Sequence, residues 1–431
     1  MTRITMNFGR GGLPLDLEDA WEVTVIRKPQ MPLLADPAAA VAQALARPVG
    51  GAPLAELART ARQACILICD ITRPVPNGLL LPPVLRTLTD AGMRPQQITI
   101  LIATGLHRPN LGAELREVIG DDWVLNNFRI ENHDACADAD HVDLGPTSQG
   151  IGVQLDRRLV QADLRLAVGL VEPHFMAGYS GGRKLIMPGV AHQQTIRRLH
   201  SAAILEHPGT RNCRLEGNPL HQQQLEIVAR LGGALGLNVV LDDHRRLSLV
   251  NFGEINASHL AAVDFVRRYA EVPVPQRFAT VITSGSGYPL DRNFYQTIKG
   301  MVAALDVLEE GGDLIVVSEC CEGLGSEAFV RAQEHLVAQG PEPFLKTLLD
   351  KPVADIDEWS TQMQLKAMRR GRVQLYAPAL SPQQAHLTGI AVVEDLPAAI
   401  RRSLQAHHGT GRPVLAVIPE GPYVVPYLAK S

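Results

Sequence analysis

Residues 164–171 read Leu-Arg-Leu-Ala-Val-Gly-Leu-Val, and this mostly apolar run ends abruptly at Glu172-Pro173-His174. A short apolar run that stops at a polar, proline-containing loop is typical of a buried strand. Similar runs occur earlier, at residues 64–69 and 97–103, and helical patterns lie between them. This alternation predicts an α/β fold, in which a mostly parallel sheet is flanked by helices.

The same alternation starts again in the second part of the 431-residue chain, which is too long for one ordinary core. Further apolar runs lie at residues 278–283, 313–318, 372–377 and 413–418. The proline-rich stretch at residues 271–276 has the composition of a linker. We therefore predict two α/β domains, at residues 1–272 and 273–431, with the active site in the interdomain cleft. The last apolar run is compatible with either sheet, so the final segment could also return to the first domain.

The bulk composition argues against several classes of protein. Hydrophobic residues make up 46% of the chain and charged residues 20%, with a formal net charge of −4. A basic face for nucleic acid is therefore not expected, and no apolar run approaches the ~20 residues that span a bilayer. The amino terminus lacks the apolar core of a signal peptide, and the six cysteines include no C-x-x-C pair. We predict a cytoplasmic protein with neither a nucleic-acid nor a membrane partner.

Ligands of open α/β sheets bind outside the carboxyl ends of the strands. The three strand ends of the first domain read Asp70-Ile71-Thr72-Arg73-Pro74, Thr104-Gly105-Leu106-His107-Arg108-Pro109 and Glu172-Pro173-His174. An arginine fork matches a carboxylate or a phosphate, and histidine is the natural general base near neutral pH. A loop ion pair and a surface histidine are the alternatives, but the convergence of these residues on one edge favours a catalytic site.

A glycine-containing loop follows His174 and ends at Lys184. Its glycines suggest that the backbone comes close to a ligand. The spacing is not that of a phosphate-binding P-loop, because Leu185 follows the lysine. Lys184 could therefore be a solvated side chain, a phosphate clamp or a covalent anchor, since a desolvated lysine is nucleophilic. His200 ends a helical pattern at residues 193–199 and, taken alone, reads as a structural residue.

The second domain contributes a loop that leads into a helix at residues 288–300. Gln296 and Lys299 are three residues apart, so they share one face of that helix. Their position near its amino-terminal end would favour a bound anion. A plain amphipathic helix is the alternative interpretation.

Taken together, these residues resemble the lactate racemase family that uses a nickel-pincer nucleotide. The matching pieces, in chain order, are Asp70-x-Thr72-Arg73-Pro74, Thr104-Gly105-x-His107, Glu172-Pro173-His174, Ser180-Gly181-Gly182-x-Lys184, His200 and Tyr295-Gln296-x-x-Lys299. This ordered set is far more specific than any single glycine-rich loop.

The resemblance implies a cofactor and the residues that hold it. Lys184 would be joined covalently to a pyridinium-3,5-bisthiocarboxylic acid mononucleotide, which carries nickel. His200 would be a direct ligand of the metal, and Lys184 would contact it through the attached cofactor. Asp70 and Thr72 would complete the cofactor-binding residues. The glycines before Lys184 would then leave room for the ring of the cofactor.

The resemblance also implies a reaction and its catalytic residues. His107 and His174 would be the paired acid/base groups. The substrate-binding residues would be Arg73, Tyr295, Gln296, Lys299 and Trp359. The enzyme would be an isomerase that inverts C2 of a 2-hydroxy acid, such as lactate. Hydride would pass to the cofactor and leave a 2-keto acid as the intermediate.

The expected partners are this small-molecule acid and, transiently, the enzymes that make the cofactor. Two other classes of function remain open from the sequence. One is a Schiff-base enzyme that uses Lys184 with a carbonyl substrate or pyridoxal phosphate. The other is a non-catalytic protein that binds a carboxylate or a metal. The sequence does not determine which 2-hydroxy acid is the substrate.

Overall fold

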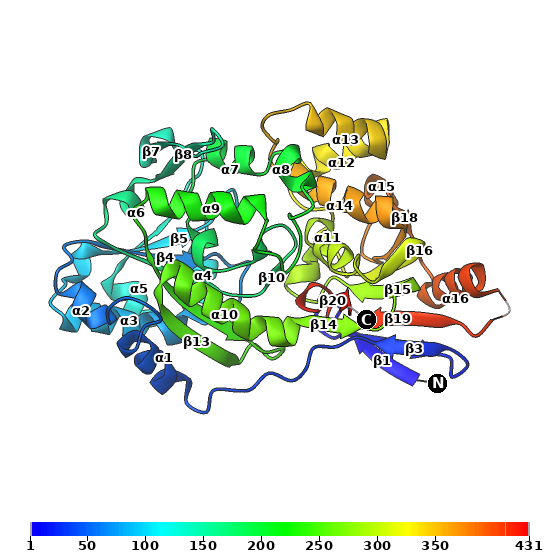
Figure 1. Ribbon diagram of the computed structural model, residues 1–431, viewed down its shortest axis with the longest axis horizontal. Helices are drawn as coiled ribbons and strands as arrows, with labels where there is room; N and C mark the ends of the chain where they lie inside the picture. Colours follow the sequence, from blue (N-terminus) through cyan, green and yellow to red (C-terminus); the bar gives the residue numbers. More distant parts are fainter. Residues whose placement is uncertain (1, 410, 430–431) are drawn as a thin grey trace.

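A six-stranded sheet forms the frame of the first of two lobes, which lie side by side in the computed structural model of residues 2–409 and 411–429 (Figure 1). In spatial order its strands are β13 (Leu247–Glu254), β12 (Leu235–Leu241), β9 (Leu164–Leu170), β4 (Ala64–Cys69), β5 (Ile98–Ala103) and β6 (Arg129–Asn132). Only the β12–β13 pair is antiparallel within this sheet. The predicted α/β fold with a mostly parallel sheet is confirmed.

Helices cover both faces of this sheet because successive strand residues point to opposite sides. Ile66 and Ile68 pack on one side of β4, and Cys65 and Leu67 pack on the other. The first face carries α1 (Pro37–Ala46), α2 (Leu54–Ala58), α3 (Asn77–Asp90), α4 (Gly112–Ile119) and α5 (Asp122–Asn127). The second carries α6 (Arg157–Gln161), α7 (Gln193–Leu199), α9 (Pro219–Arg230) and α10 (Ile255–Ala270).

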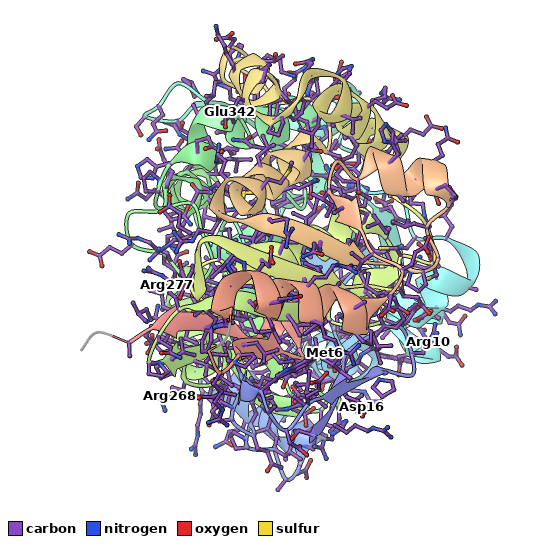
Figure 2. All side chains as sticks on the ribbon, turned by 90° about the vertical axis from the view of Figure 1, so that its right-hand side faces the viewer. Met6, Arg10, Asp16, Arg268, Arg277 and Glu342 are labelled. Atoms are coloured by element: carbon purple, nitrogen blue, oxygen red, sulfur yellow. The ribbon has the colours of Figure 1, made fainter. Side chains whose placement is uncertain are left out.

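The second lobe is built on another six-stranded sheet, which is parallel throughout. Its strands are β18 (Ala391–Val392), β17 (Arg372–Tyr376), β16 (Leu308–Val317), β15 (Phe278–Ser284), β19 (Val414–Ile418) and β3 (Glu22–Val25). One face packs on α11 (Phe294–Ala303) and α14 (Glu358–Arg370). The other face is crossed by α16 (Leu396–His408), with the hairpin of β1 (Thr2–Met6) and β2 (Leu13–Leu17) beside it (Figure 2).

Smaller elements complete the chain. The remaining helices are α8 (Ala202–Glu206), α12 (Glu327–Gln339), α13 (Pro341–Leu349) and α15 (Pro382–Leu387). Short 3-10 turns are η1 (Pro95–Gln97), η2 (Asp138–Asp140), η3 (Gly182–Leu185), η4 (Leu290–Arg292) and η5 (Gly421–Tyr423). Two-stranded pairs join β7 (His141–Pro146) to β8 (Gly152–Asp156), β10 (Pro173–His174) to β11 (Gly178–Tyr179), and β14 (Glu271–Val274) to β20 (Val425–Leu428).

Segments from both ends of the chain belong to the second lobe. The last predicted run, now β19, lies in the second sheet beside β15, and β3 extends that sheet from the amino-terminal side. The sheets therefore do not divide the chain at a single point, and the boundary after residue 272 stays a prediction. The stretch expected to be a linker forms β14 instead and pairs with β20. Residues before a proline favour extended backbone, so a linker and a short strand of this composition look alike in sequence.

A continuous apolar core joins the lobes. One buried cluster includes Leu67 and Leu101 of the first sheet together with Val281 and Val316 of the second. This packing holds the carboxyl ends of β4, β5 and β9 against the second lobe. Within the described ranges, no helix combines the length and apolar character that crossing a membrane would require.

Candidate active site

A cavity of about 180 Å³ lies between the lobes, outside the carboxyl ends of β4, β5 and β9. Every site residue predicted from the sequence lines it. The first lobe contributes Asp70, Thr72, Arg73, His107, His174, Lys184 and His200, and the second contributes Tyr295, Gln296, Lys299 and Trp359. The structure thus brings all of these side chains to one place, while their individual roles stay predictions.

His107 is held by the carboxylate at the end of β4. Its Nδ1–H donates to Oδ2 of Asp70 at 2.6 Å, and the Thr72 hydroxyl donates to the other carboxylate oxygen at 2.6 Å. Desolvation by the surrounding protein opposes the charged forms of both partners, although 47% of the His107 side chain is exposed toward the cavity. Their mutual attraction prevails: the pKa of Asp70 lies below its ordinary value and the pKa of His107 lies above it. Nε2 of His107 is therefore the ring nitrogen left for a ligand.

His174 lies in the opposite electrostatic environment. Its Nδ1 accepts hydrogen bonds from the backbone N–H groups of Met176 and Ala177, each at 3.2 Å. A nitrogen that accepts from backbone cannot carry the proton, so the neutral ring is protonated at Nε2. Burial, and then the charges of Lys184 and Lys299, lower the pKa of His174 well below its ordinary value. The two histidines are thus arranged with opposite tendencies: one to hold a positive charge, the other to remain neutral.

Lys184 lies in η3, the 3-10 turn that ends the glycine-containing loop. Burial lowers its pKa to about 7, and the charges of Arg183 and Arg73 add to the effect. Arg183 is 1% exposed and donates to the carbonyls of Ala177 (2.8 Å) and Tyr179 (3.2 Å), which fixes the loop that precedes the lysine. An amine that is about half deprotonated at pH 7 and faces a cavity is a competent nucleophile.

His200 ends α7, as the helical pattern predicted. Its Nδ1–H donates to the carbonyl of Ile196 at 2.8 Å, so Nε2 of the neutral ring keeps its lone pair. Burial lowers the pKa of His200 to about 4. The ring of Trp359 lies beside it, with centroids 4.8 Å apart. A fixed, neutral imidazole with one free nitrogen is a suitable metal ligand.

Helix α11 brings the second lobe to the cavity. Asn293 caps it by accepting from the backbone N–H of Gln296 at 3.1 Å, and Tyr295, Gln296 and Lys299 follow within the first turns. Burial, and then the charge of Arg73, lower the pKa of Lys299 well below its ordinary value. Trp359 donates its indole N–H to the hydroxyl of Tyr295 at 3.0 Å, which links α14 to α11.

Two acidic residues at the site had no role assigned from the sequence. Glu172 forms an ion pair with Arg73 at 3.2 Å. Asp357 lines the cavity with a backbone φ of +65°, accepts a hydrogen bond from the hydroxyl of Ser326 at 2.5 Å, and helps burial to raise the pKa of Tyr295. Glu172 could have been paired with Arg73 from their shared sheet edge. Asp357 carried no signal, because its place depends on packing between distant segments.

The glycines of the loop before Lys184 are required by close contacts within the protein. Gly178, Gly181 and Gly182 all have positive φ. A Cβ on Gly178 would lie 2.3 Å from the carbonyl oxygen of Arg214, and one on Gly181 would lie 2.9 Å from that of Leu170. These contacts show that the glycines allow a tight backbone path packed against the protein itself. Gly181 also lines the cavity, so the interpretation that the loop leaves room for a cofactor ring stays a prediction.

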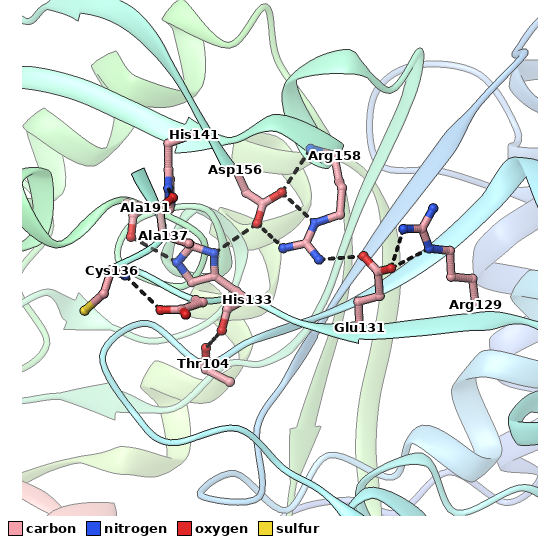
Figure 3. A network of polar contacts seen from close by, with 11 residues as sticks. Thr104, Arg129, Glu131, His133, Cys136, Ala137, His141, Asp156, Arg158 and Ala191 are labelled. Atoms are coloured by element: carbon pink, nitrogen blue, oxygen red, sulfur yellow. Dashed lines mark hydrogen bonds and ion pairs between the residues drawn. The ribbon is translucent and has the colours of Figure 1, made fainter. Parts of the chain in front are cut away.

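A network of polar contacts extends from Thr104 to Arg129, with the buried His133 and Asp156 at its centre (Figure 3). His133 bonds to Asp156 at 3.0 Å and to the carbonyl of Ala191 at 3.1 Å, while Arg158 joins Asp156 to Glu131. Thr104, which lines the cavity, donates to the carbonyl of His133 at 2.8 Å. The hydrogen bond from Thr104 ties this network to the carboxyl end of β5. In the part of the chain that the structure describes, no cluster of three or more potential metal ligands occurs.

Comparison with known proteins identifies the class. Residues 8–212 match the lactate racemase N-terminal domain, and residues 275–425 match the lactate racemase C-terminal domain. The chain is 32% identical to a lactate racemase of Lactiplantibacillus plantarum over 385 residues, which cover 88% of this chain and 89% of that protein. It is 30% identical over 429 residues to a lactate racemase of Thermoanaerobacterium thermosaccharolyticum, with 99% of each chain covered.

Comparison with solved structures leads to the same family. The lactate racemase apoprotein from T. thermosaccharolyticum superposes with a TM-score of 0.90 at 29% identity, covering 99% of this chain and all of that one. A crystal structure from Thermotoga maritima, at 16% identity and a TM-score of 0.65, shares the fold over 87% of this chain and 96% of that one. The two-domain α/β fold is thus that of a racemase. This chain belongs to the lactate racemase family, and it is accordingly an enzyme of the isomerase class.

Proposed function

We propose that this enzyme racemises a 2-hydroxy acid, with lactate as the first candidate, at the cavity between its lobes. The relatives that carry the name lactate racemase support the substrate class. The observation that carries the proposal is the arrangement of the cavity: two histidines with opposite tendencies, His107 and His174, share it with the basic side chains of Arg73 and Lys299. Such a site suits a small anion that gains and loses a proton.

The carboxylate of the substrate would bind to Arg73, Gln296 and Lys299. The low pKa of Lys299 reflects burial among positive charges, which a bound carboxylate would offset. The side-chain oxygen of Gln296 is buried without a hydrogen-bond partner among the described residues, so its amide is not tied to the protein. Tyr295 and Trp359, joined by their hydrogen bond, would shape the wall that meets the substituent at C2.

The two histidines would handle the hydroxyl proton. Nε2 of His107, backed by Asp70, would accept the proton from one enantiomer, because the carboxylate stabilises the imidazolium that forms. For His174 to act on the other face, Nδ1 would have to leave its backbone contacts and take up a proton from solvent. Nε2 of the resulting imidazolium would then give its proton to the substrate oxygen and keep a lone pair for the reverse step. The roles would exchange in the reverse direction. Each histidine would therefore serve as base for one enantiomer and as acid for the other.

The residues of the cavity fit the nickel-pincer nucleotide that the resemblance implies. Lys184 offers an amine with a pKa of about 7 for a covalent link, and His200 offers a fixed nitrogen for the metal. Asp70 and Thr72 would complete its surroundings. When bound, such a group supplies a hydride acceptor, so that C2 can pass through a 2-keto acid, which no side chain here can provide. Transient contact with cofactor-synthesis enzymes and a cytoplasmic location belong to the same proposal.

A panel of chiral 2-hydroxy acids tests the function. Enzyme made together with the cofactor-synthesis enzymes is expected to interconvert D- and L-lactate or a close relative, followed by chiral chromatography. His107→Ala and His174→Ala should each reduce the rate by about 10²–10⁴-fold, because each removes one proton carrier. Unchanged racemisation in both directions by either variant would refute the two-histidine scheme, and failure on every 2-hydroxy acid would refute the substrate class.

A further inference from the structure

A second cavity, of about 280 Å³, lies between the lobes on the other side of the β9 loop. It is bounded by the ends of β9 and β12 in the first lobe and by the loops after β15 and β19 in the second. The ion pair of Arg73 and Glu172 separates the two spaces, because Arg73 lines the active-site cavity and Glu172 lines this one. Nothing in the proposed reaction uses the second cavity.

Glu420 lines this second cavity with a carboxylate that is buried and incompletely paired. Its side chain is 8% exposed, and its Oε2 has no hydrogen-bond partner within residues 2–409 and 411–429. Its other oxygen has a weak contact with Arg27, at 3.9 Å, and the Arg27 side chain is 47% exposed. A buried carboxylate that lacks partners costs stability unless a donor completes it.

The other charges of the cavity interior are already paired. Lys28 forms an ion pair with Asp243, and Glu172 forms one with Arg73. Arg10 stacks on the ring of Tyr288, 3.5 Å from its centroid, at the exposed rim. The interior therefore keeps one incompletely compensated negative charge, that of Glu420.

We propose that this cavity is a second small-molecule site, in which the Glu420 carboxylate binds the ammonium group of a primary amine. The unpaired oxygen needs an N–H donor, and a cationic donor also neutralises the charge. The ring of Tyr423 lines the same wall and already tolerates a cation, since Nζ of Lys28 lies 6.0 Å from its centroid. An occupant would touch both lobes, because the wall comes from both.

The pH dependence of binding follows from the surroundings of Glu420. Burial raises its pKa to about 7; Asp243 adds to this, while Lys28 and Arg27 oppose it. The other titratable groups that face the cavity are Arg10, Glu172, Asp242, Arg245, Tyr288 and Tyr423. An ammonium ion binds the ionised carboxylate, so affinity should increase as pH rises through 7, by about tenfold between pH 6 and pH 8.

Calorimetric titration of the full-length enzyme with n-butylammonium chloride tests the site, with sodium butyrate and n-butanol as comparison ligands. The amine should bind with one-to-one stoichiometry, and lactate should not displace it. Glu420→Gln should weaken binding by about tenfold or more. The matched control Glu310→Gln, at an exposed position of β16, should leave binding unchanged.

A gain-of-affinity variant keeps the test independent of misfolding. Arg27→Ala removes the weak competitor of the amine and should tighten binding. The proposal is overturned by the absence of saturable amine binding, by equal binding of butyrate, by displacement with lactate, or by unchanged binding in Glu420→Gln. Because the titration uses no racemase activity, its failure leaves the proposed reaction untouched, and an inactive enzyme could still bind the amine.

Discussion

The pair formed by His107 and Asp70 controls when the catalytic imidazole carries a charge. Asp70→Asn removes the carboxylate that raises the pKa of His107 and leaves burial, which lowers it. We expect the pKa of His107, followed by NMR, to fall, and the acidic limb of the pH profile of kcat/KM to move to lower pH. An unmoved limb would show that His107 does not need to be deprotonated.

The same variant should lose stability in a defined pH window. The raised pKa of His107 stabilises the fold below about pH 6.5, and this contribution is lost as pH rises through the folded pKa. The lowered pKa of Asp70 stabilises it above about pH 3.9, and this is lost as pH falls. The loss in the free energy of unfolding caused by Asp70→Asn should be greatest between these two pH values. We expect a loss of only about 1 kcal/mol, because the His107 side chain is 47% exposed and solvent screens the ion pair. Chemical denaturation against pH measures it, with exposed Asp90→Asn as the control.

The variants Lys184→Ala and His200→Ala should differ in whether they retain the nucleotide of the cofactor. Lys184→Ala removes the proposed anchor, so the purified protein should carry neither nucleotide nor nickel. His200→Ala removes only a metal ligand, so it should keep the nucleotide and lose nickel. Metal analysis and intact mass, measured on the same samples, check both. A nucleotide still covalently bound in Lys184→Ala would contradict the anchor.

At the scale of elements, the glycine loop before Lys184 is held by backbone contacts. Gly178→Ala should destabilise the enzyme, because its φ is +78° and a Cβ would lie 2.3 Å from the carbonyl of Arg214. Gly150→Ala is a matched control, with a φ of +74° and no atom within 4 Å of the added Cβ. Gly150→Ala should lower the free energy of unfolding by about 1–2 kcal/mol, and Gly178→Ala should lower it clearly more. Urea midpoints for the two variants compare the costs, and equal losses would show that the close contact does not matter.

The sequence predicts those elements whose local pattern agrees with their environment. The strands at residues 64–69 and 164–170 and the helix that ends at His200 follow from apolar runs and polar stops. Strand β14 was missed because its prolines resemble those of a linker, and its partner β20 lies far away in the chain. The tight packing of the glycines was not predicted because the atoms they contact, in Leu170 and Arg214, become neighbours only after folding.

At the scale of the whole molecule, the cleft was predictable and its details were not. Because ligands bind at the carboxyl ends of parallel strands, the positions of His107 and His174 in the sequence already predict that they share one site. The family resemblance added Tyr295 and Trp359 and placed Gln296 and Lys299 of the other lobe at the same site, and all four line the cavity. The inclusion of β3 in the second sheet, the place of Asp357 and the second cavity at Glu420 all depend on packing between remote segments.

The mass of the peptide that contains Lys184 tests the central claim most directly. It should be measured on active enzyme made together with the cofactor-synthesis enzymes, with and without borohydride treatment. We predict a stable nucleotide adduct on Lys184, with nickel present in the intact protein and no need for reduction to retain the adduct. An unmodified Lys184 in enzyme that racemises a 2-hydroxy acid, or an adduct seen only after borohydride reduction, as for a Schiff base, would contradict the account.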